Sequence, residues 1–368
     1  MKNKILIQLS RPHLPKISEY KKLLDRIWKT RLITNFGYYA QQMESEASKF
    51  LKTKNISVVS SCDLGLIISL KALNLKGGDE VILSPFTFNS TANSILWNNL
   101  KPIFADVDAE TWCIDPEDVK RRITKKTRVI LGTHVFGNPC DIDELRNIAN
   151  KHNLTLMFDA AQAYGSSYKG RKVGILGDIE VFSFSGTKTV VSAEGGMIVF
   201  KDNNLTRLFK LMRNYGFSHD YNTQVLGINS KISEFNAALG YLSLKGVNNS
   251  LKIRNKIAKN YIKKLSGIGD IKFQKVRQGN ISTFKDFCIL TSKRDKLSTF
   301  LIKNGIESRN YFYPINKTDY FKRYYESLPN VNDISSKNIC IPIFNDITKD
   351  QQDYVISKIK EFFKNYEK

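Results

Sequence analysis

The sequence predicts an α/β protein in which a mostly parallel, mixed sheet lies between helices and a smaller α+β domain follows at the C-terminus. Short apolar runs alternate with helical patterns from about residue 56, and this alternation is typical of a sheet covered on both faces. After about residue 250 the pattern changes to lysine-rich amphipathic helices. A chain of 368 residues also fits two domains better than one.

The first half of the chain supplies strands and helices in alternation. Each predicted strand is a short apolar run, and the predicted helices carry apolar residues at helical spacing. Asp115 and Asp141 stand directly before two of the helices, where we expect them to act as N-caps. The predicted order is strand Ile56–Ser60, helix Leu64–Leu73, strand Glu80–Leu83, helix Thr91–Trp97, strand Pro102–Val107, helix Pro116–Ile123, strand Arg128–Gly132, helix Ile142–Ala149 and strand Leu154–Phe158.

We place the domain boundary near residue 250, between a large domain of residues 1–250 and a small domain of residues 251–368. The first dozen residues are expected to pack on the small domain. Within the small domain the sequence predicts a lysine-rich helix followed by three further elements, at Leu251–Leu265, Thr283–Leu290, Leu297–Asn304 and Gln351–Phe363.

The chain is strongly basic, with 57 Lys and Arg residues against 35 Asp and Glu and a formal net charge of +22. One interpretation is a polyanionic partner, either a nucleic acid or a phosphorylated small molecule. Because the basic residues are dispersed along the whole chain, we favour the other interpretation, in which lysines cover solvated faces. Charge alone therefore assigns no partner.

Cysteine usage and hydropathy exclude several classes of protein. The five cysteines are odd in number and show no C-x-x-C spacing, which excludes a fully paired disulfide framework and the usual zinc ribbon. The four histidines are scattered, which argues against a histidine-rich metal site. No apolar run reaches the ~18 residues of a membrane span, and the N-terminus lacks the apolar stretch of a secretory signal. We therefore expect a cytoplasmic protein with no metal and no membrane partner.

Polar or special residues follow several of the predicted strands. Parallel sheets bind ligands at the carboxyl ends of their strands, so these residues are expected to gather at one edge. Each segment is weak evidence by itself, because sheet edges are often polar for solubility alone. The segments are Ser60–Asp63, Ser84–Phe88, His134–Gly137 and Asp159–Gln162.

The most informative stretch runs from Val181 to Thr189 and holds Lys188 among hydroxyl side chains, with Gly195 and Gly196 behind it. A partly desolvated lysine in such a place suits an amine that forms a Schiff base, because its neutral form must be accessible. Taken alone, Lys188 would be interpreted as a solvated loop lysine, since lysines are mostly exposed.

Other residues at the same predicted edge support the chemical interpretation of Lys188. A carboxylate at Asp159 could hold a protonated pyridine nitrogen and make the ring an electron sink, although Asp159 could also be a helix N-cap. Gln162 can reach the same pocket, and Ser183 offers a hydroxyl to a phosphate. The amides that follow Ser61 form a predicted helix N-terminus, which is a natural anion site.

These motifs resemble the DegT/StrS-type family of sugar aminotransferases, which are pyridoxal-phosphate (PLP) enzymes of fold type I. The S-x-T-K motif at Lys188 is weak alone, but together with the D-A-A-Q segment at Asp159 it is specific. The resemblance covers nearly the whole chain, at Arg11-Pro12, Thr34-Asn35, Val58–Phe200, Gly227–Lys231, Ser308–Pro314 and Ile341–Ile343.

The resemblance implies a role for each matching residue. Lys188 matches the lysine that carries the cofactor, Asp159 the acid at the pyridine nitrogen, and Gln162 the residue beside the ring hydroxyl. Phe88 matches the aromatic residue stacked on the ring, although without the family it could as well be a core Phe. Ser183 matches a phosphate ligand. Asn229 resembles an asparagine that reaches the phosphate from the other subunit, which implies a homodimer with shared active sites.

The sequence also departs from the family pattern at several positions. Cys62-Asp63 replaces the usual Gly-Thr or Ala-Thr of the phosphate loop; a carboxylate there repels a phosphate unless Asp63 turns away and caps the helix. Lys231 replaces a commoner arginine and loses its fork geometry. Phe312 stands where many members have a histidine before Tyr313. The resemblance implies substrate contacts by Phe312, Tyr313 and Lys231. His134 lies in an H-x-x-G turn and is expected to support structure rather than catalysis.

The function implied by the resemblance is a PLP-dependent aminotransferase that converts a nucleotide-linked keto sugar, expected to be a keto-6-deoxy hexose, with glutamate as the amino donor and Lys188 as the general base. Four alternatives stand beside it. Amination of a cyclitol or another keto substrate is open. A non-catalytic regulator or nucleic-acid binder on the same fold is disfavoured, because the cofactor residues are present apart from the change at Cys62-Asp63 and no helix-turn-helix or aromatic RNA-binding motif is evident. A PLP sugar dehydratase is disfavoured because such relatives carry histidine in place of the lysine. A Rossmann oxidoreductase is disfavoured because no G-x-G-x-x-G follows a strand.

Overall fold

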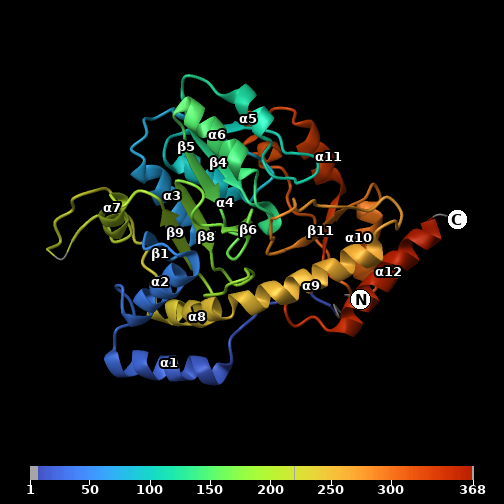
Figure 1. Ribbon diagram of the computed structural model, residues 1–368, viewed down its shortest axis with the longest axis horizontal. Helices are drawn as coiled ribbons and strands as arrows, with labels where there is room; N and C mark the ends of the chain where they lie inside the picture. Colours follow the sequence, from blue (N-terminus) through green and yellow to red (C-terminus); the bar gives the residue numbers. More distant parts are fainter. Residues whose placement is uncertain (1–6, 219, 367–368) are drawn as a thin grey trace.

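The computed structural model describes residues 7–218 and 220–366, and its centre is a seven-stranded sheet (Figure 1). The strand order is β1-β9-β8-β5-β4-β2-β3, in which β9 is antiparallel to both neighbours and the other pairs are parallel. This confirms the predicted mostly parallel mixed sheet. The strands are β1 (Ile56–Val59), β2 (Glu80–Leu83), β3 (Lys101–Phe104), β4 (Thr127–Thr133), β5 (Thr155–Asp159), β8 (Ile179–Ser183) and β9 (Gly196–Phe200).

The sheet separates two hydrophobic cores because successive side chains of a strand point to opposite faces. In β1, Val58 packs in the core with α2 and α8, whereas Val59 packs in the core with α3 and α6. A minor two-stranded ribbon, β6 (Ser167–Tyr168) with β7 (Arg171–Lys172), lies outside the sheet. The helices up to residue 245 are α1 (Ile17–Thr30), α2 (Tyr38–Leu51), α3 (Cys62–Ala72), α4 (Asn89–Trp97), α5 (Pro116–Arg122), α6 (Ile142–His152), α7 (Leu205–Met212) and α8 (Glu234–Lys245).

The two predicted helix caps behave differently. Asp115 accepts a hydrogen bond from the Glu117 amide at 3.0 Å and caps α5, as expected. Asp141 occupies the N-cap position of α6, but its side chain makes no cap bond. Its carboxylate instead accepts from the Tyr168 hydroxyl at 3.0 Å and pairs with Arg277. The prediction for Asp141 was wrong because partners distant in sequence compete for the same oxygens.

A smaller unit follows, built on the three-stranded antiparallel sheet β10-β11-β12. Figure 1 shows α9 running from α8 towards α12 at the C-terminal side. The predicted element at 283–290 is a strand only from Phe287 onwards. The elements are α9 (Val247–Leu265), β10 (Lys272–Phe273), β11 (Phe287–Leu290), α10 (Arg294–Lys303), α11 (Pro329–Lys337), β12 (Asn338–Ile341) and α12 (Lys349–Tyr366), with short 3-10 turns at Val135–Gly137, Ile315–Lys317 and Lys322–Tyr324.

The N-terminal segment lies against this smaller unit where the structure describes it. Ile7 pairs with Ile306 and is buried in the third hydrophobic core, and the Ile343 amide donates to the Leu9 carbonyl at 3.0 Å. Residues 1–6 of the expected contact lie outside the described residues. The domain boundary near residue 250 falls inside α9 and stays a prediction. Across the described ranges, none of the helices combines the length and apolar character needed to cross a membrane.

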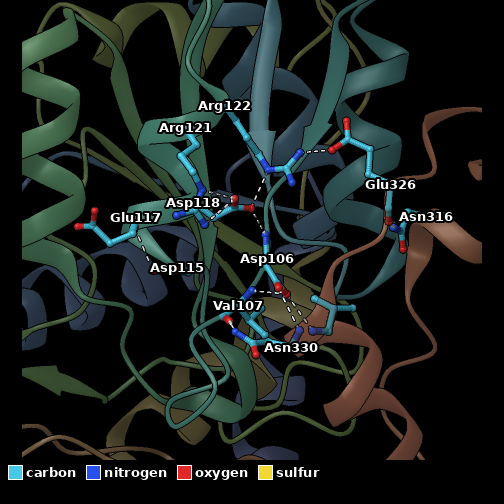
Figure 2. Close-up of polar contacts among 11 residues, drawn as sticks. Asp106, Val107, Asp115, Glu117, Asp118, Arg121, Arg122, Asn316, Glu326 and Asn330 are labelled. Carbon is cyan, nitrogen blue, oxygen red and sulfur yellow. Dashed lines mark hydrogen bonds and ion pairs between the residues drawn. The ribbon is translucent and has the colours of Figure 1, made fainter.

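A buried acidic cluster fastens α11 to the end of β3 (Figure 2). The Asp106 carboxylate accepts from the backbone amides of Asn330 and Val331 at 3.0 and 2.9 Å, so a residue just after β3 caps α11. Asp118 accepts from the Asp106 amide at 2.6 Å and also binds Arg122, which pairs in turn with Glu326. Residues 326–331, which lead into α11, are therefore held at one end by Arg122 of α5 and at the other by Asp106 after β3.

We expect Asp106→Ala to lower the free energy of unfolding by about 2 kcal/mol, because it leaves buried amide donors of α11 without an acceptor. The matched control is Glu117→Ala, which removes an exposed ion pair with Lys120 and should cost less than about 0.5 kcal/mol. Urea unfolding at pH 7 measures both variants. Equal losses would show that the cap does not hold α11.

Candidate active site

A cavity of ≈ 370 Å³ opens at the carboxyl ends of the parallel strands. The sheet register places Thr133, Asp159 and Val181 side by side across β4, β5 and β8. The edge predicted from the sequence therefore exists, and most of the predicted site residues meet there. Those that line the cavity are Cys62, Asp63, Phe88, Asp159, Gln162, Ser183, Lys188 and Phe312.

Lys188 follows β8 in a compact loop and lines this cavity. The loop is closed by the Lys188 amide donating to the Ser185 carbonyl and by the Phe184 amide donating to the Gly195 carbonyl. Burial lowers the pKa of the Lys188 amine, and the neighbouring Lys285 lowers it further. Lys188 thus lies in the cavity wall and not in a solvated loop. Its partial desolvation there favours the neutral amine.

Asp159 ends β5 and is only 4% exposed. Its carboxylate accepts from the Thr91 hydroxyl at 2.6 Å and from the Ala161 amide at 3.0 Å. Burial raises the pKa of Asp159, although these two hydrogen bonds act in the opposite direction. Within the described ranges, no lysine or arginine lies at ion-pair distance from it. The residues after Asp159 form turns rather than a helix, so the N-cap alternative does not apply.

A chain of three threonine hydroxyls leads to Asp159, and the sequence analysis missed it. Thr133 donates to Thr87 at 3.1 Å, Thr87 lies 2.9 Å from Thr91, and Thr91 donates to Asp159. Since the Thr91 proton is used on Asp159, Thr87 donates to Thr91. In the sequence, Thr87 and Thr133 follow predicted strands and Thr91 begins a predicted helix. Solvated threonines occupy the same kinds of position, so these positions alone do not indicate a hydrogen-bonded chain.

Phe88 stands at the mouth of the cavity with 63% of its surface exposed. This rules out the core alternative, and an exposed ring beside a cavity is suited to stacking on a flat ligand. Gln162 accepts from the Phe136 amide at 2.5 Å through its side-chain oxygen, which leaves its amide nitrogen as the available donor. Ser183 is buried and also lines the cavity.

The N-terminus of α3 supplies backbone amides to one end of the cavity. Ser61 caps this helix by accepting from the Leu64 amide at 3.2 Å. Of the two alternatives left open for Asp63, the capping role is taken by Ser61 instead, and Asp63 lies in the first turn and lines the cavity. Gly196 allows this approach, because a Cβ there would lie 2.6 Å from the Cys62 nitrogen. Burial raises the pKa of the Cys62 thiol well above its usual value, so the thiol is neutral.

Three predicted residues lie outside this cavity. Asn229 is exposed and bridges to Asn214, and Tyr313 is 67% exposed. Lys231 donates to Asn35 at 2.7 Å and lines a second cavity of ≈ 780 Å³. Phe312 does line the first cavity, but its ring also stacks on Phe136 with centroids 5.7 Å apart. The proposed contacts of Asn229, Lys231, Phe312 and Tyr313 with ligands stay predictions.

His134 is fully buried and stacks on Phe158 with ring centroids 4.5 Å apart. Its Nδ1 accepts from the Cys140 amide at 3.1 Å. Burial lowers the pKa of His134 to about 3, so the imidazole is neutral near pH 7. These contacts agree with the structural role expected for it.

Comparison with known proteins places this arrangement in a family. The model of the DegT/DnrJ/EryC1/StrS aminotransferase family matches residues 16–360. The chain therefore belongs to the DegT/DnrJ/EryC1/StrS aminotransferases, and the family resemblance predicted from its motifs is confirmed.

Relatives match over nearly their full length. The dTDP-4-amino-4,6-dideoxy-D-glucose transaminase of Escherichia coli is 34% identical over 358 residues, which cover 94% of this chain and 95% of the relative. The GDP-perosamine synthase of Vibrio cholerae is 32% identical, with coverage of 90% and 92%. The crystal structure of S. venezuelae DesV in complex with a ketimine intermediate superposes with a TM-score of 0.92 at 26% identity, covering 96% of this chain and 99% of DesV.

We expect Asp159→Asn to stabilise the ligand-free protein by about 1–2 kcal/mol at pH 7, because it removes a buried charge without a cationic partner. The folded-state pKa of Asp159 is raised, so the cost of its charge grows as the pH rises above the unfolded value near 4. The gain should therefore shrink as the pH falls towards 4. Urea unfolding across this range measures it, with the fully exposed Asp319→Asn as control. A gain independent of pH would contradict the assignment.

Proposed function

We propose that this protein is a PLP-dependent aminotransferase that converts a nucleotide-linked keto sugar, such as a keto-6-deoxy hexose, to the amino sugar, with glutamate as the donor. The single observation that carries the proposal is that Lys188 and Asp159 line one cavity. The activities for which the two relatives are named support a nucleotide-sugar substrate. They differ in the nucleotide, so the proposal leaves the nucleotide open.

The donor set of the cavity fits PLP. Asp159 is a buried carboxylate whose missing counter-charge a protonated pyridine nitrogen would supply. Phe88 offers an exposed ring face, and the Gln162 amide nitrogen offers a donor to the ring hydroxyl. Ser183 and the first amides of α3 would hold the phosphate. When bound, PLP supplies a cationic conjugated ring that stabilises negative charge on the α-carbon of the donor.

The residues of this chain would then divide the remaining work. The Lys188 amine would carry the cofactor and, once released, would take the proton from the donor α-carbon and deliver it to the adjoining carbon of the cofactor. The threonine chain would hold the Asp159 carboxylate in place through the hydrogen bond from Thr91. Phe88 and Phe312 at the walls limit the access of water to the reacting atoms.

We also propose that the working unit is a homodimer. Asn229 and Lys231 lie outside the Lys188 cavity of their own chain, which supports a contribution to the cavity of a second copy. Exposed apolar side chains on and next to α1, including Ile17, Trp28 and Ile33, are of the kind that subunit interfaces cover.

The regulator and the other keto substrates differ from the proposed function in the residues or the substrates that they need. A regulator on this fold would need neither the desolvated Lys188 nor the buried Asp159, and both are present. A cyclitol or another keto substrate would use the same half-reaction with glutamate. A panel of dTDP-, UDP- and GDP-linked keto sugars, with a keto cyclitol beside them, separates these substrates.

The purified protein with PLP should show the visible absorption band of lysine-bound cofactor, and glutamate should bleach that band. Lys188→Ala should abolish both the band and the bleaching, whereas the control Lys275→Ala, which removes an exposed lysine paired with Glu110, should leave them unchanged. Absorption spectroscopy measures both. A colourless protein that ignores glutamate would reject the aminotransferase in favour of the regulator.

We expect Asp63→Thr to tighten PLP retention by about tenfold, because it removes a carboxylate that faces the phosphate end of the cavity. Asp63→Asn removes the charge at nearly constant shape and should give a similar gain. Equilibrium dialysis of PLP measures the affinity. Unchanged or weaker binding in both variants would show that the carboxylate of Asp63 is not a liability.

A further inference from the structure

A second lysine lines the Lys188 cavity and belongs to a segment that the sequence motifs did not mark. Lys285 and its neighbour Asp286 are 6% and 4% exposed, and both line the cavity. The Lys285 ammonium lies 2.9 and 3.1 Å from the two Asp286 oxygens. A buried ammonium is stable only beside such a counter-ion. The Asp286 carboxylate therefore lets Lys285 hold an ammonium group in the cavity wall.

The backbone of this segment is held rigidly against the large sheet. The Thr283 hydroxyl donates to the Gln162 carbonyl at 2.5 Å, and the Lys285 amide donates to the Phe136 carbonyl at 3.0 Å. Arg254 of α9, only 5% exposed, donates to the Phe284 carbonyl at 3.0 Å and to the Lys285 carbonyl at 2.6 Å. Because a buried guanidinium directs its donors at these carbonyls, Lys285 has little freedom to leave the cavity.

We propose that Lys285 is a positioning residue whose ammonium, in the cavity wall that it shares with Lys188, disfavours a second positive charge on the Lys188 amine, with Asp286 as the counter-ion that limits the effect. The inference deepens the proposed function and rests on it, because an attached and proton-moving lysine must be neutral. Like charges that share a desolvated site disfavour each other's charged forms. The ionisable groups that face Lys188 across the cavity are Cys62, Asp63, Asp159, Glu194, Lys285, Asp286 and Tyr311.

The signs of the neighbouring charges give variants with opposite expectations. After burial, Lys285 is the main influence that lowers the pKa of Lys188, whereas Asp286 and Asp159 raise it. Lys285→Met should therefore raise the pKa of Lys188, and Asp286→Asn should lower it. Lys285→Arg keeps the charge and should leave it unchanged. The double variant Lys285→Met/Asp286→Asn removes both charges and should return the pKa towards the wild-type value.

The test uses the full-length protein without PLP. Acetic anhydride at trace concentration acylates only neutral amines, and mass spectrometry of the Lys188 peptide across pH 6–10 gives the midpoint of its titration. We expect the midpoint to rise by roughly one pH unit in Lys285→Met. Lys275→Met, at an exposed position that does not line the cavity, is the matched control. Circular dichroism establishes that each variant is folded.

The outcomes separate this inference from the proposed function. A midpoint in Lys285→Met equal to that of the wild type would overturn the role of Lys285, and so would a shift of Asp286→Asn in the same direction as Lys285→Met. Should Lys285→Met not fold, the downward shift in Asp286→Asn and the unchanged midpoint in Lys285→Arg decide the question. A protein that never binds PLP would reject the proposed function while leaving this titration readable.

Discussion

The arrangement of the site depends on keeping the Asp159 carboxylate buried at the end of β5. Burial disfavours the charged form, and among the described residues the Thr91 hydroxyl and the Ala161 amide donate to it directly. The strand register places Thr133 beside it, the turn between β2 and α4 supplies Thr87, and the first turn of α4 supplies Thr91. Asp159 is therefore a buried carboxylate that hydrogen bonds hold in place, with no described lysine or arginine at ion-pair distance. A cationic ligand would supply the positive charge that Asp159 lacks.

The second constraint is the balance of charges around Lys188. Two lysines and several acids share a small desolvated volume, so the protonation state of each depends on the others. Lys285 and Asp286 are adjacent in sequence and cancel most of each other's charge at a distance. Close to the pair, however, the electric field depends on how the ammonium and the carboxylate are oriented. The hydrogen-bonded backbone of residues 283–285 fixes that orientation.

The fold was largely predictable because its signals are local. Strands such as Glu80–Leu83 are short apolar runs, and the helix at Pro116 begins with a proline and an acidic cap. The rule that ligands bind at the carboxyl ends of parallel strands also brought Asp159, Lys188 and Phe88 together before their positions were known. The prediction for Asp141 failed because Tyr168 and Arg277 lie far away in sequence. Lys285 was missed for the same reason, since no local pattern marks it.

The path of α9 has a mechanical consequence. This helix follows α8 after a single glycine, crosses to the smaller unit and packs against α12. Arg254 belongs to α9 and donates to the carbonyls of Phe284 and Lys285, so α9 connects the C-terminal helix with this segment. A displacement of α12 would therefore move the wall of the cavity that Lys285 forms, although Lys285 lies 83 residues before residue 368 in sequence.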